Sequence, residues 1–420
     1  MKALLQVAKL ELLSAVRSKA MAMLAFASVA WMLVLPYIAV DDGTADGAYQ
    51  MHVRYSLGVV FAVVLVSLSA AAAGTVAKDR DAKRLQLTLV RPVRHSLVAL
   101  GRIAALSLVG AAVLAAACTI LGFQVGAGRT CDHVLRPRLE PPEVAARRMM
   151  DESLAKYPDF RAKVAEIGER DVLQYLLQVV RDKYQTVGEG ETASWDFAVT
   201  DPSAAPLAVR IRITDMFGRL EKAKGVFSYG GLEGRMDHLN KAVVRIPLVA
   251  AASGAQGDQP GVLTFRNEGE LGVSVYPRRD LVLLAGADGF WWNVARAWIV
   301  LSSLVAIAIA MGVFLGASLG RGVAVFCIMA ILAASVISPS ALEEFPDPLA
   351  TSRSDRLSLR LTNFSAWFTS PLNAYEPVSA LEADECVEWR DVARASGIGF
   401  VAYPLAFALL AGFVMRRKVD

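Results

Sequence analysis

The sequence of 420 residues has little of what catalysis and metal binding require. Only four histidines and four cysteines occur, none in His-Glu-x-x-His or Cys-x-x-Cys spacing, so we expect no metal site. No Gly-x-x-x-x-Gly-Lys-Ser/Thr loop is present, so the chain has no P-loop for nucleotide phosphates. We therefore expect no cofactor and no enzyme activity of the chain's own. A hydrolase is an alternative for which no nucleophile is recognised.

Charged residues are also scarce. They make up 20% of the chain against 55% hydrophobic residues, and the mean hydropathy is +0.42. This composition is too apolar for an ordinary soluble domain. The net charge of +4 does not indicate a nucleic-acid partner, because the basic residues fall at the ends of apolar runs. There they orient and anchor helices at a lipid bilayer.

Six long apolar runs give the sequence its main signal. They are rich in Ala, Val and Leu without two-residue alternation, which excludes a membrane β-barrel. At about 1.5 Å of rise per residue, a helix of about 20 residues spans a hydrocarbon core of about 30 Å. The sequence therefore predicts an α-helical integral membrane protein with six transmembrane helices. We place helices one to three within 21–127, helices four and five within 290–338, and helix six with a basic C-terminus within 396–420.

Basic clusters mark one end of each run. Lys9, Arg17 and Lys19 precede the first run, and the basic residues from Lys78 to Arg94 separate the second run from the third. Arg321 lies in the turn between the fourth and fifth runs, and Arg416 and Arg417 follow the sixth. Loops rich in Lys and Arg lie on the cytoplasmic side. We therefore predict a multi-pass membrane protein with both termini in the cytoplasm. Arg102 and Arg296 lie near span ends, and we expect their charged heads to reach the polar interface.

Residues 1–20 have the pattern of an amphipathic helix. Leu5, Ala8, Leu12 and Val16 recur at three- and four-residue steps, with charged residues between them. Such a helix lies in the plane of the inner membrane interface. Two roles stay open: the helix anchors the chain, or its polar face binds a cytoplasmic partner.

Residues 128–289 form an insertion between the third and fourth predicted spans that is long enough to bury a core of its own. From Pro141 to about Tyr184 we expect one broken helix or two. Alternating segments predict strands at 208–214, 242–247, 261–266 and 271–276, with further candidates at 195–199 and 281–284. We therefore predict an extracytoplasmic α+β domain that contains an antiparallel β-sandwich.

A second outer stretch, 339–395, is too polar to span. We expect a packed loop with one or two short helices, with a substrate-binding lid as the alternative. Cys131 and Cys386 both fall on the outer side, where disulfides persist. We hypothesise that they pair and tie the outer loop to the base of the sandwich. The alternative is two free thiols too far apart to bridge.

The segment from Ala73 to Arg102 resembles the permease subunits of type-2 ABC exporters. Those proteins commonly have a small-residue span, an acidic residue, a Leu-rich segment, a Pro followed by Val or Ile with Arg nearby, and Gly-Lys or Gly-Arg opening the next span. The matching residues here are Asp79, the Leu-Gln-Leu-Thr-Leu segment 85–89, Pro92-Val93 and Gly101-Arg102. The amphipathic start, the six-span plan and the basic ending are also similar to that family. Two departures stand out: Lys83-Arg84 replaces a frequent Gly-Thr, and the smallest members lack the large insertion.

The resemblance implies that the cytoplasmic segment 78–97, together with the helix in 1–20, binds a separate ABC-type ATPase. The docking residues that it implies are Asp79, Arg84, Leu87, Arg91, Pro92 and Arg94. For each arginine the alternative is anchoring to lipid headgroups alone. The resemblance also implies a dimer with a second copy or a similar permease.

The resemblance therefore implies the membrane-spanning permease subunit of an ABC exporter in a bacterial inner (plasma) membrane. It would couple ATP hydrolysis by the partner to transport or to force on the outer domain. The alternative is a membrane-anchored scaffold or binding protein whose outer sandwich holds glycan or protein without an ATPase.

Overall fold

The computed structural model describes the chain apart from residues 1, 39–44, 82–93, 127, 158–159, 162–163, 166–167, 182, 198–205, 215–221, 240–242, 251–260, 271, 279, 344–371, 373–374 and 418–420. The chain divides into two compact units. A helical unit comprises Met1–Cys131, Asp288–Leu342 and Leu361–Asp420, and a sheet unit comprises Asp132–Ala287 and Glu343–Arg360.

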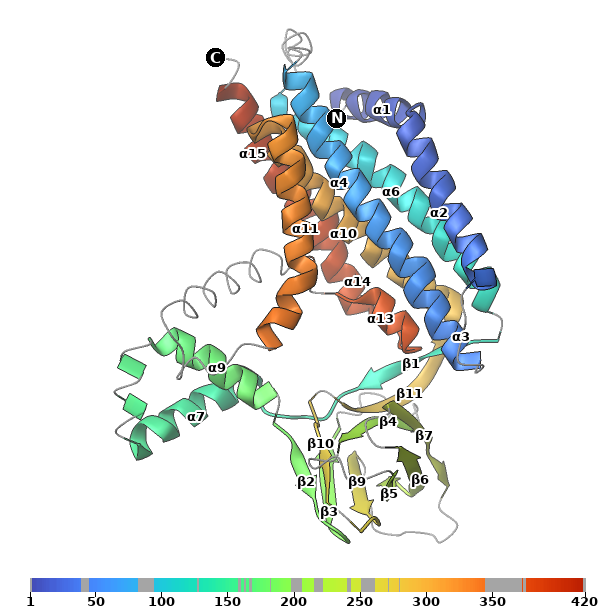
Figure 1. Ribbon diagram of the computed structural model, residues 1–420, viewed down its shortest axis with the longest axis vertical. Coiled ribbons are helices and arrows are strands. Elements are labelled where there is room, and N and C mark those ends of the chain that lie inside the picture. The colour runs from blue at the N-terminus through green and yellow to red at the C-terminus, as the bar shows by residue number, and fades with distance from the viewer. Residues whose placement is uncertain are drawn as a thin grey trace. The chain divides into compact units, whose positions relative to one another are not determined.

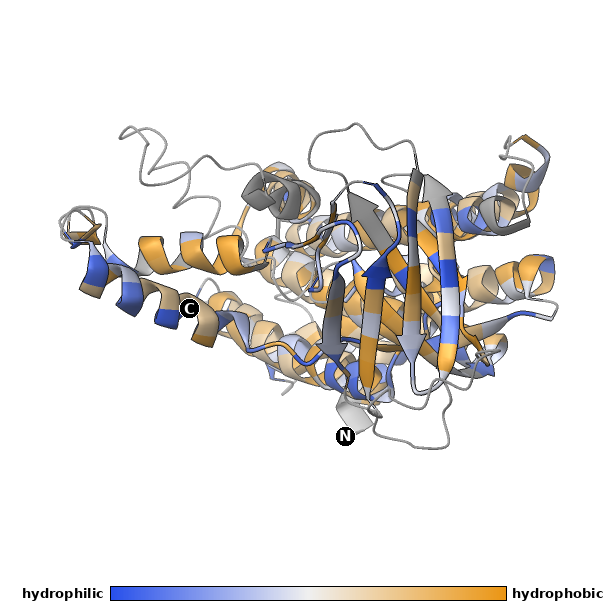
Figure 2. Ribbon diagram, turned by 90° about the horizontal axis from the view of Figure 1, so that it is seen from below, coloured by the Kyte–Doolittle hydropathy of each residue, from blue (hydrophilic) through white to orange (hydrophobic). Residues whose placement is uncertain are grey.

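The helical unit is a bundle of long helices with shorter ones at one end (Figure 1). Its described elements are α1 (Lys2–Val16), α2 (Lys19–Ile38), α3 (Ala45–Met51), η1 (His52–Leu57), α4 (Gly58–Asp81), α6 (His95–Val125), α10 (Phe290–Ser318), α11 (Arg321–Glu343), α13 (Pro377–Glu382), α14 (Trp389–Ser396), η3 (Gly397–Ala402) and α15 (Tyr403–Arg417). The two η segments are π-helical turns within longer helices. Figure 2 shows these helices coloured mainly as hydrophobic, as their apolar runs require.

Five described helical segments are long and apolar enough to cross a membrane. They are Lys19–Ile38, Ala48–Lys78, His95–Val125, Phe290–Ser318 and Trp389–Arg417. The fifth run of the sequence lies in α11, whose described apolar stretch, Arg321–Ser335, is shorter. A chain with long apolar helices is therefore confirmed, and the sixth span stays a prediction. The last helix also begins at Trp389, before the expected start at 396, because α14, η3 and α15 are continuous.

α10 is the central helix of the unit. Nearly every residue from Val300 to Val313 is buried against its neighbours. Glycines let the backbones approach closely: a Cβ added at Gly312 would collide with the carbonyl oxygen of Ser69, and one at Gly316 with that of Ala73, both on α4. Small residues at four-residue steps permit such contacts between apolar helices. α4 and α10 therefore form a tightly packed pair.

The sheet unit contains two β-sheets and a pair of helices, α7 (Pro142–Lys156) and α9 (Glu169–Arg181). The strands are β1 (Thr130–Leu135), β2 (Gln185–Val187), β3 (Thr192–Asp196), β4 (Pro206–Thr214), β5 (Lys222–Tyr229), β6 (Leu232–Leu239), β7 (Val243–Pro247), β8 (Val249–Ala250), β9 (Val262–Asn267), β10 (Val273–Val275) and β11 (Leu281–Gly289). One sheet has the order β1-β11-β4-β10-β2, with β7 also on β4, and the other has the order β3-β9-β5-β6-β8. The pairings among β2 to β10 are antiparallel.

Alternation of side chains gives the two sheets one shared core. Ile211 of β4 and Leu283 of β11 come from the first sheet, and Phe227 of β5 and Phe265 of β9 come from the second. The two phenyl rings lie 4.6 Å apart between centroids. The strands in Figure 2 accordingly show alternating hydrophilic and hydrophobic bands. Antiparallel sheets in a region apart from the apolar helices are therefore confirmed, while α7 and α9 bury a separate small core.

The β5–β6 hairpin was not predicted from the sequence. Its two strands are joined by Gly230 and Gly231, which have φ of 55° and 83°. Two residues with positive φ are what a two-residue hairpin turn requires, and glycine adopts this conformation without strain. The Gly-Gly pair was therefore the available signal. The strand before it was hard to recognise because alternate buried positions are small, as at Ala223 and Gly225.

Candidate functional site

Most of the predicted docking residues lie outside the described part of the chain. Arg84, Leu87, Arg91 and Pro92 all belong to 82–93, the segment between α4 and α6. Asp79 lies in the last turns of α4. Arg94 is described: it is the exposed residue before α6, with an extended backbone (φ −64°, ψ 134°) from which the helix begins. The docking role of these residues therefore remains a prediction.

The described residues show which helices meet the start of α6, the helix that follows this segment in the sequence. α1 packs along the first turns of α6, and a Cβ added at Gly101 would lie 2.8 Å from Val7 Cγ1 on α1. α15 approaches the same turns, where a Cβ at Gly412 would lie 2.7 Å from the backbone nitrogen of Ser96. The two glycines therefore allow α1 and α15 to meet the start of α6, directly after 82–93 (Figure 1).

An ion pair fixes α1 to α6. Arg102 donates from Nε and Nη2 to Glu11 Oε1, at 2.9 and 2.5 Å. The Arg102 side chain is 10% exposed and that of Glu11 is 28% exposed. We expected Arg102 to extend to the interface, and this stays a prediction; the structure adds that Glu11 of α1 pairs with the arginine. A charged arginine inside an apolar run calls for a partner, and Glu11 is the only acidic residue in 1–20.

Basic residues surround this junction, and we call the region the basic end of the helical unit. Its exposed, described members are Lys9, Arg17, Lys19, Lys78, Arg94, Arg321, Arg416 and Arg417. Arg321 opens α11 beside Gly74 of α4, since a Cβ at Gly74 would lie 3.9 Å from Arg321 Nε. Helices that are far apart in the sequence thus bring positive charge to one end of the helical unit.

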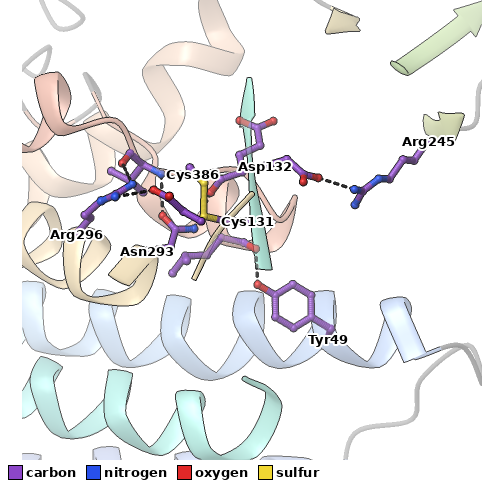
Figure 3. The surroundings of a disulfide bond; sticks show 11 residues. Tyr49, Cys131, Asp132, Arg245, Asn293, Arg296 and Cys386 are labelled. Carbon is purple, nitrogen blue, oxygen red and sulfur yellow. Dashed lines mark hydrogen bonds and ion pairs between the residues drawn. A yellow bond between two sulfur atoms is a disulfide. The ribbon is translucent and has the colours of Figure 1, made fainter. Parts of the chain in front are cut away.

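A disulfide between Cys131 and Cys386 lies at the other end of the helical unit, with a Cα–Cα distance of 5.1 Å (Figure 3). The structure therefore contains the pairing hypothesised from the sequence. Cys118 and Cys327 are free, and both lie within the apolar helices.

Side chains of α10 hold the segment next to this disulfide. Asn293 donates from Nδ2 to the Glu385 carbonyl at 2.7 Å and accepts from the Val387 backbone N–H at 2.7 Å (Figure 3). Asn293 is 1% exposed. Its amide therefore satisfies two backbone groups of 385–387 in the way that a neighbouring strand would.

Arg296, one turn further along α10, binds the same segment. Its Nη2 lies 2.7 Å from Asp288 Oδ2, its Nη1 donates to the Val387 carbonyl at 3.3 Å, and its guanidinium lies over the Trp389 ring at 4.9 Å. Our expectation that this side chain extends to the interface likewise stays a prediction. Buried charges require partners, and Arg296 finds them in Asp288, Val387 and Trp389.

Arg129 and Tyr49 complete the clamp around 381–387. Arg129 Nη1 lies 3.0 Å from Asp384 Oδ2, and its guanidinium lies 3.9 Å from the centroid of the Tyr49 ring. Tyr49 donates from its hydroxyl to the Leu381 carbonyl at 2.6 Å. The disulfide is thus one of several bonds that fasten 381–387 to α3, α10 and the start of β1.

The sheet unit has one buried acid close to the disulfide in sequence. Asp132 is 3% exposed, and its Oδ2 lies 2.6 Å from Arg245 Nη2 (Figure 3). Burial raises the pKa of the Asp132 carboxyl, and the nearby Arg245, His133 and Arg210 oppose this rise.

One short pattern in the chain matches a hydrolase motif by spelling alone. Gly316-Ala317-Ser318-Leu319-Gly320 has the form Gly-x-Ser-x-Gly, which in hydrolases places the serine on a strand-to-helix turn. Here Ser318 ends α10, and its hydroxyl donates to the Phe314 carbonyl at 2.9 Å. The pattern therefore does not form a nucleophile elbow.

Comparison of the chain with models of known protein families, with curated proteins and with solved structures finds no match.

Proposed function

We propose that this chain is the membrane-spanning permease subunit of an ABC exporter in a bacterial inner membrane. A separate ABC-type ATPase binds at the basic end, where α1 and the segment 82–93 meet the start of α6. The subunit couples ATP hydrolysis by that partner to transport, or to force on the sheet unit. A second copy or a similar permease completes the pore.

The observation that carries this proposal is the bond between Glu11 and Arg102. An amphipathic helix that only anchors a chain needs apolar contact with lipid and charge for headgroups. α1 is instead locked by a largely buried ion pair to the helix that 82–93 enters. Any push on α1 or on 82–93 is thereby delivered to the same turns of α6, which suits a coupling element.

Exposed apolar side chains support the membrane placement. Phe26, Phe123 and Phe326 are 76%, 78% and 72% exposed on three different long helices. Long apolar helices that expose large apolar side chains suit contact with lipid hydrocarbon. Trp291 and Trp292, at the start of α10, suit the outer interface, and the basic end suits the cytoplasmic one. We infer six spans, with α11 as the fifth.

The sheet unit is then extracytoplasmic. Two sheets with a shared core and antiparallel pairing favour a β-sandwich, joined to α7 and α9. A disulfide at the end opposite to the basic one favours an oxidising compartment on that side, such as the periplasm.

Charge reversal tests the docking surface. We expect Arg84→Glu with Arg91→Glu to abolish co-purification of the ATPase from mild detergent. Arg54→Glu is the control at the opposite end of α4: Arg54 is 65% exposed in η1, and its ion pair with Glu382 is long, at 3.7 Å, so its loss should cost little. The control should retain the ATPase. Unchanged co-purification by the double variant would refute the docking role and favour lipid anchoring.

A further inference from the structure

A cavity of about 400 Å³ lies between α6, α10 and the continuous helix η3–α15. This volume falls within the range of about 300–1,000 Å³ that is typical of small-molecule sites. The wall is mainly hydrocarbon, and among the described side chains that line it none is charged. The hydroxyl groups of Ser107 and Ser302 are polar groups in this mainly apolar wall.

Both hydroxyls lack a hydrogen-bond partner within the described chain. Ser107 is 8% exposed and Ser302 is 2% exposed, so water satisfies neither well. Serine in a helix ordinarily donates to a carbonyl of the preceding turn. The next residue, Ser303, does so to the Val300 carbonyl at 2.7 Å. A buried unpaired hydroxyl is unfavourable, so two at one cavity point to a ligand that pairs with them.

The helix on the third side of the cavity is irregular where it meets the site. η3 is a π-helical turn, and Phe400 within it and Pro404 just after it both line the cavity. Because Pro404 has no N–H, the Phe400 carbonyl loses its α-helical donor. π-helical turns inside α-helices occur frequently at functional sites.

The position along the helices limits the chemistry of the ligand. At about 1.5 Å per residue, Ser107 lies about 18 Å along α6 from the start of that helix. Ser302 lies about 18 Å along α10 from the start of α10, and the two helices run in opposite directions. Both hydroxyls are therefore near the middle of their spans. A charged group would be costly at this depth, and the lining offers no opposite charge.

We propose that this cavity binds a neutral, mainly hydrocarbon molecule with one hydroxyl or carbonyl group. The ligand exchanges hydrogen bonds with Ser107 and Ser302 after rotation about χ1 turns their hydroxyls into the cavity. A long-chain alcohol or a neutral lipid has this chemistry. The proposal rests on the membrane placement proposed above, and it does not depend on the ATPase.

A photoreactive ligand pair tests the site in membranes that contain the full chain. One probe is a long-chain alcohol with a diazirine in its alkyl chain, and the other is the matching alkane without the hydroxyl. We expect the alcohol to label peptides of α6, α10 and η3 about tenfold more than the alkane does, since one hydrogen bond is worth up to that factor. Labelling of α2, which does not line the cavity, gives the baseline for bulk lipid contact.

Two variants separate a ligand role from a structural one. Ser107→Ala with Ser302→Ala should abolish the preference for the alcohol while leaving or raising the melting temperature of the unliganded protein, because it removes unpaired polar groups. Ser303→Ala is the matched control on α10, and it should keep the preference, since Ser303 already has an intrahelical partner.

Equal labelling by alcohol and alkane, or a preference that survives in the double variant, would overturn the proposal. So would a fall in melting temperature of the double variant larger than that of Ser303→Ala. Release of the chain from membranes by alkaline wash would refute the membrane placement itself. Failure of ATPase co-purification would leave the labelling result standing, so the two proposals fail separately.

Discussion

Glu11 of α1 and Arg102 of α6 form an ion pair whose Oε1–Nη2 distance is 2.5 Å, although 91 residues separate them. The pair lies where α6 emerges from the segment 82–93. It joins the amphipathic N-terminal helix mechanically to a predicted span, and it provides the first test of the account.

Replacement of Glu11 by Gln should weaken the contact between α1 and α6, although the glutamine side chain has nearly the same size and shape. Hydrogen bonds to charged groups contribute about 1.5–3 kcal/mol to the free energy of unfolding. Because the variant retains a neutral acceptor, we expect its free energy of unfolding to fall by an amount in the lower half of that range. Glu11→Ala should lose more, because it leaves Arg102 buried without a partner. In thermal unfolding of the detergent-solubilised protein, the melting temperature should fall in the order wild type, Glu11→Gln, Glu11→Ala. Lys9→Ala, an exposed neighbour on α1, should change little.

The junction also predicts a functional effect. If α1 transmits the motion of the ATPase, Glu11→Ala should lower ATP hydrolysis coupled to the permease more than it lowers co-purification of the two subunits. A parallel loss of both would mean that α1 serves docking alone.

Removal of the disulfide should destabilise the end of the helical unit opposite to the basic end. Loss of a native disulfide typically costs about 2–5 kcal/mol, and this one closes a loop with a sequence separation of 255. We expect Cys131→Ser with Cys386→Ser to lower the melting temperature under oxidising conditions. Cys118→Ala with Cys327→Ser retains the bridge and is the control. A thiol count on oxidised, denatured wild type should give two reactive cysteines, and four would contradict the bond.

Asn293 should matter as much as the disulfide, because its amide serves two backbone groups that have little access to water. Asn293→Leu leaves the Glu385 carbonyl and the Val387 N–H without this partner, at about 1–3 kcal/mol for each group. Hydrogen exchange of 383–388 should quicken markedly in this variant. Ser303→Ala removes only one intrahelical bond on the same helix and should leave that exchange unchanged.

Asp132 predicts a pH dependence of the sheet unit. Its pKa is raised in the folded state, so the folded protein binds the proton more tightly than the unfolded chain does, whose value is about 3.9. The stability that Asp132 adds by binding this proton is therefore complete below about pH 3.9 and is lost as the pH rises through the folded pKa. Asp132→Asn should abolish this fall in stability with rising pH. Arg245→Gln should extend it to higher pH, because Arg245 lowers the pKa. Protection of β4 and β7 amides, corrected for intrinsic exchange, reports the change.

The sequence predicted the long helices well because each is encoded locally by an apolar run. The strands at 206–214 and 281–289 were likewise visible from their alternation or apolar content. The fifth span was the weakest prediction, and its described apolar stretch, Arg321–Ser335, is also the shortest. Local patterns therefore gave the kind of element and roughly where it lies.

The contacts that define the candidate sites were harder to predict, because they join residues far apart in the chain. Nothing near Asn293 indicates that it pairs with 385–387, and nothing near Ser302 indicates that Ser107 shares its cavity. For Arg102 a signal existed, since a charge in an apolar run needs a partner and only one acid lies in 1–20. The prediction for Arg102 considered only the depth of its side chain in the membrane and not an acidic partner.

The proposed function depends on a separate ABC-type ATPase as partner. To find that partner, the tagged full chain is purified from its native membrane in mild detergent, and the bound proteins are quantified by mass spectrometry. We expect an ATP-binding-cassette ATPase at near-equal stoichiometry, lost in the Arg84→Glu, Arg91→Glu variant and kept in Arg54→Glu. Recovery of a protein or glycan of the outer face, with no ATPase, would refute the permease role and favour a membrane-anchored scaffold.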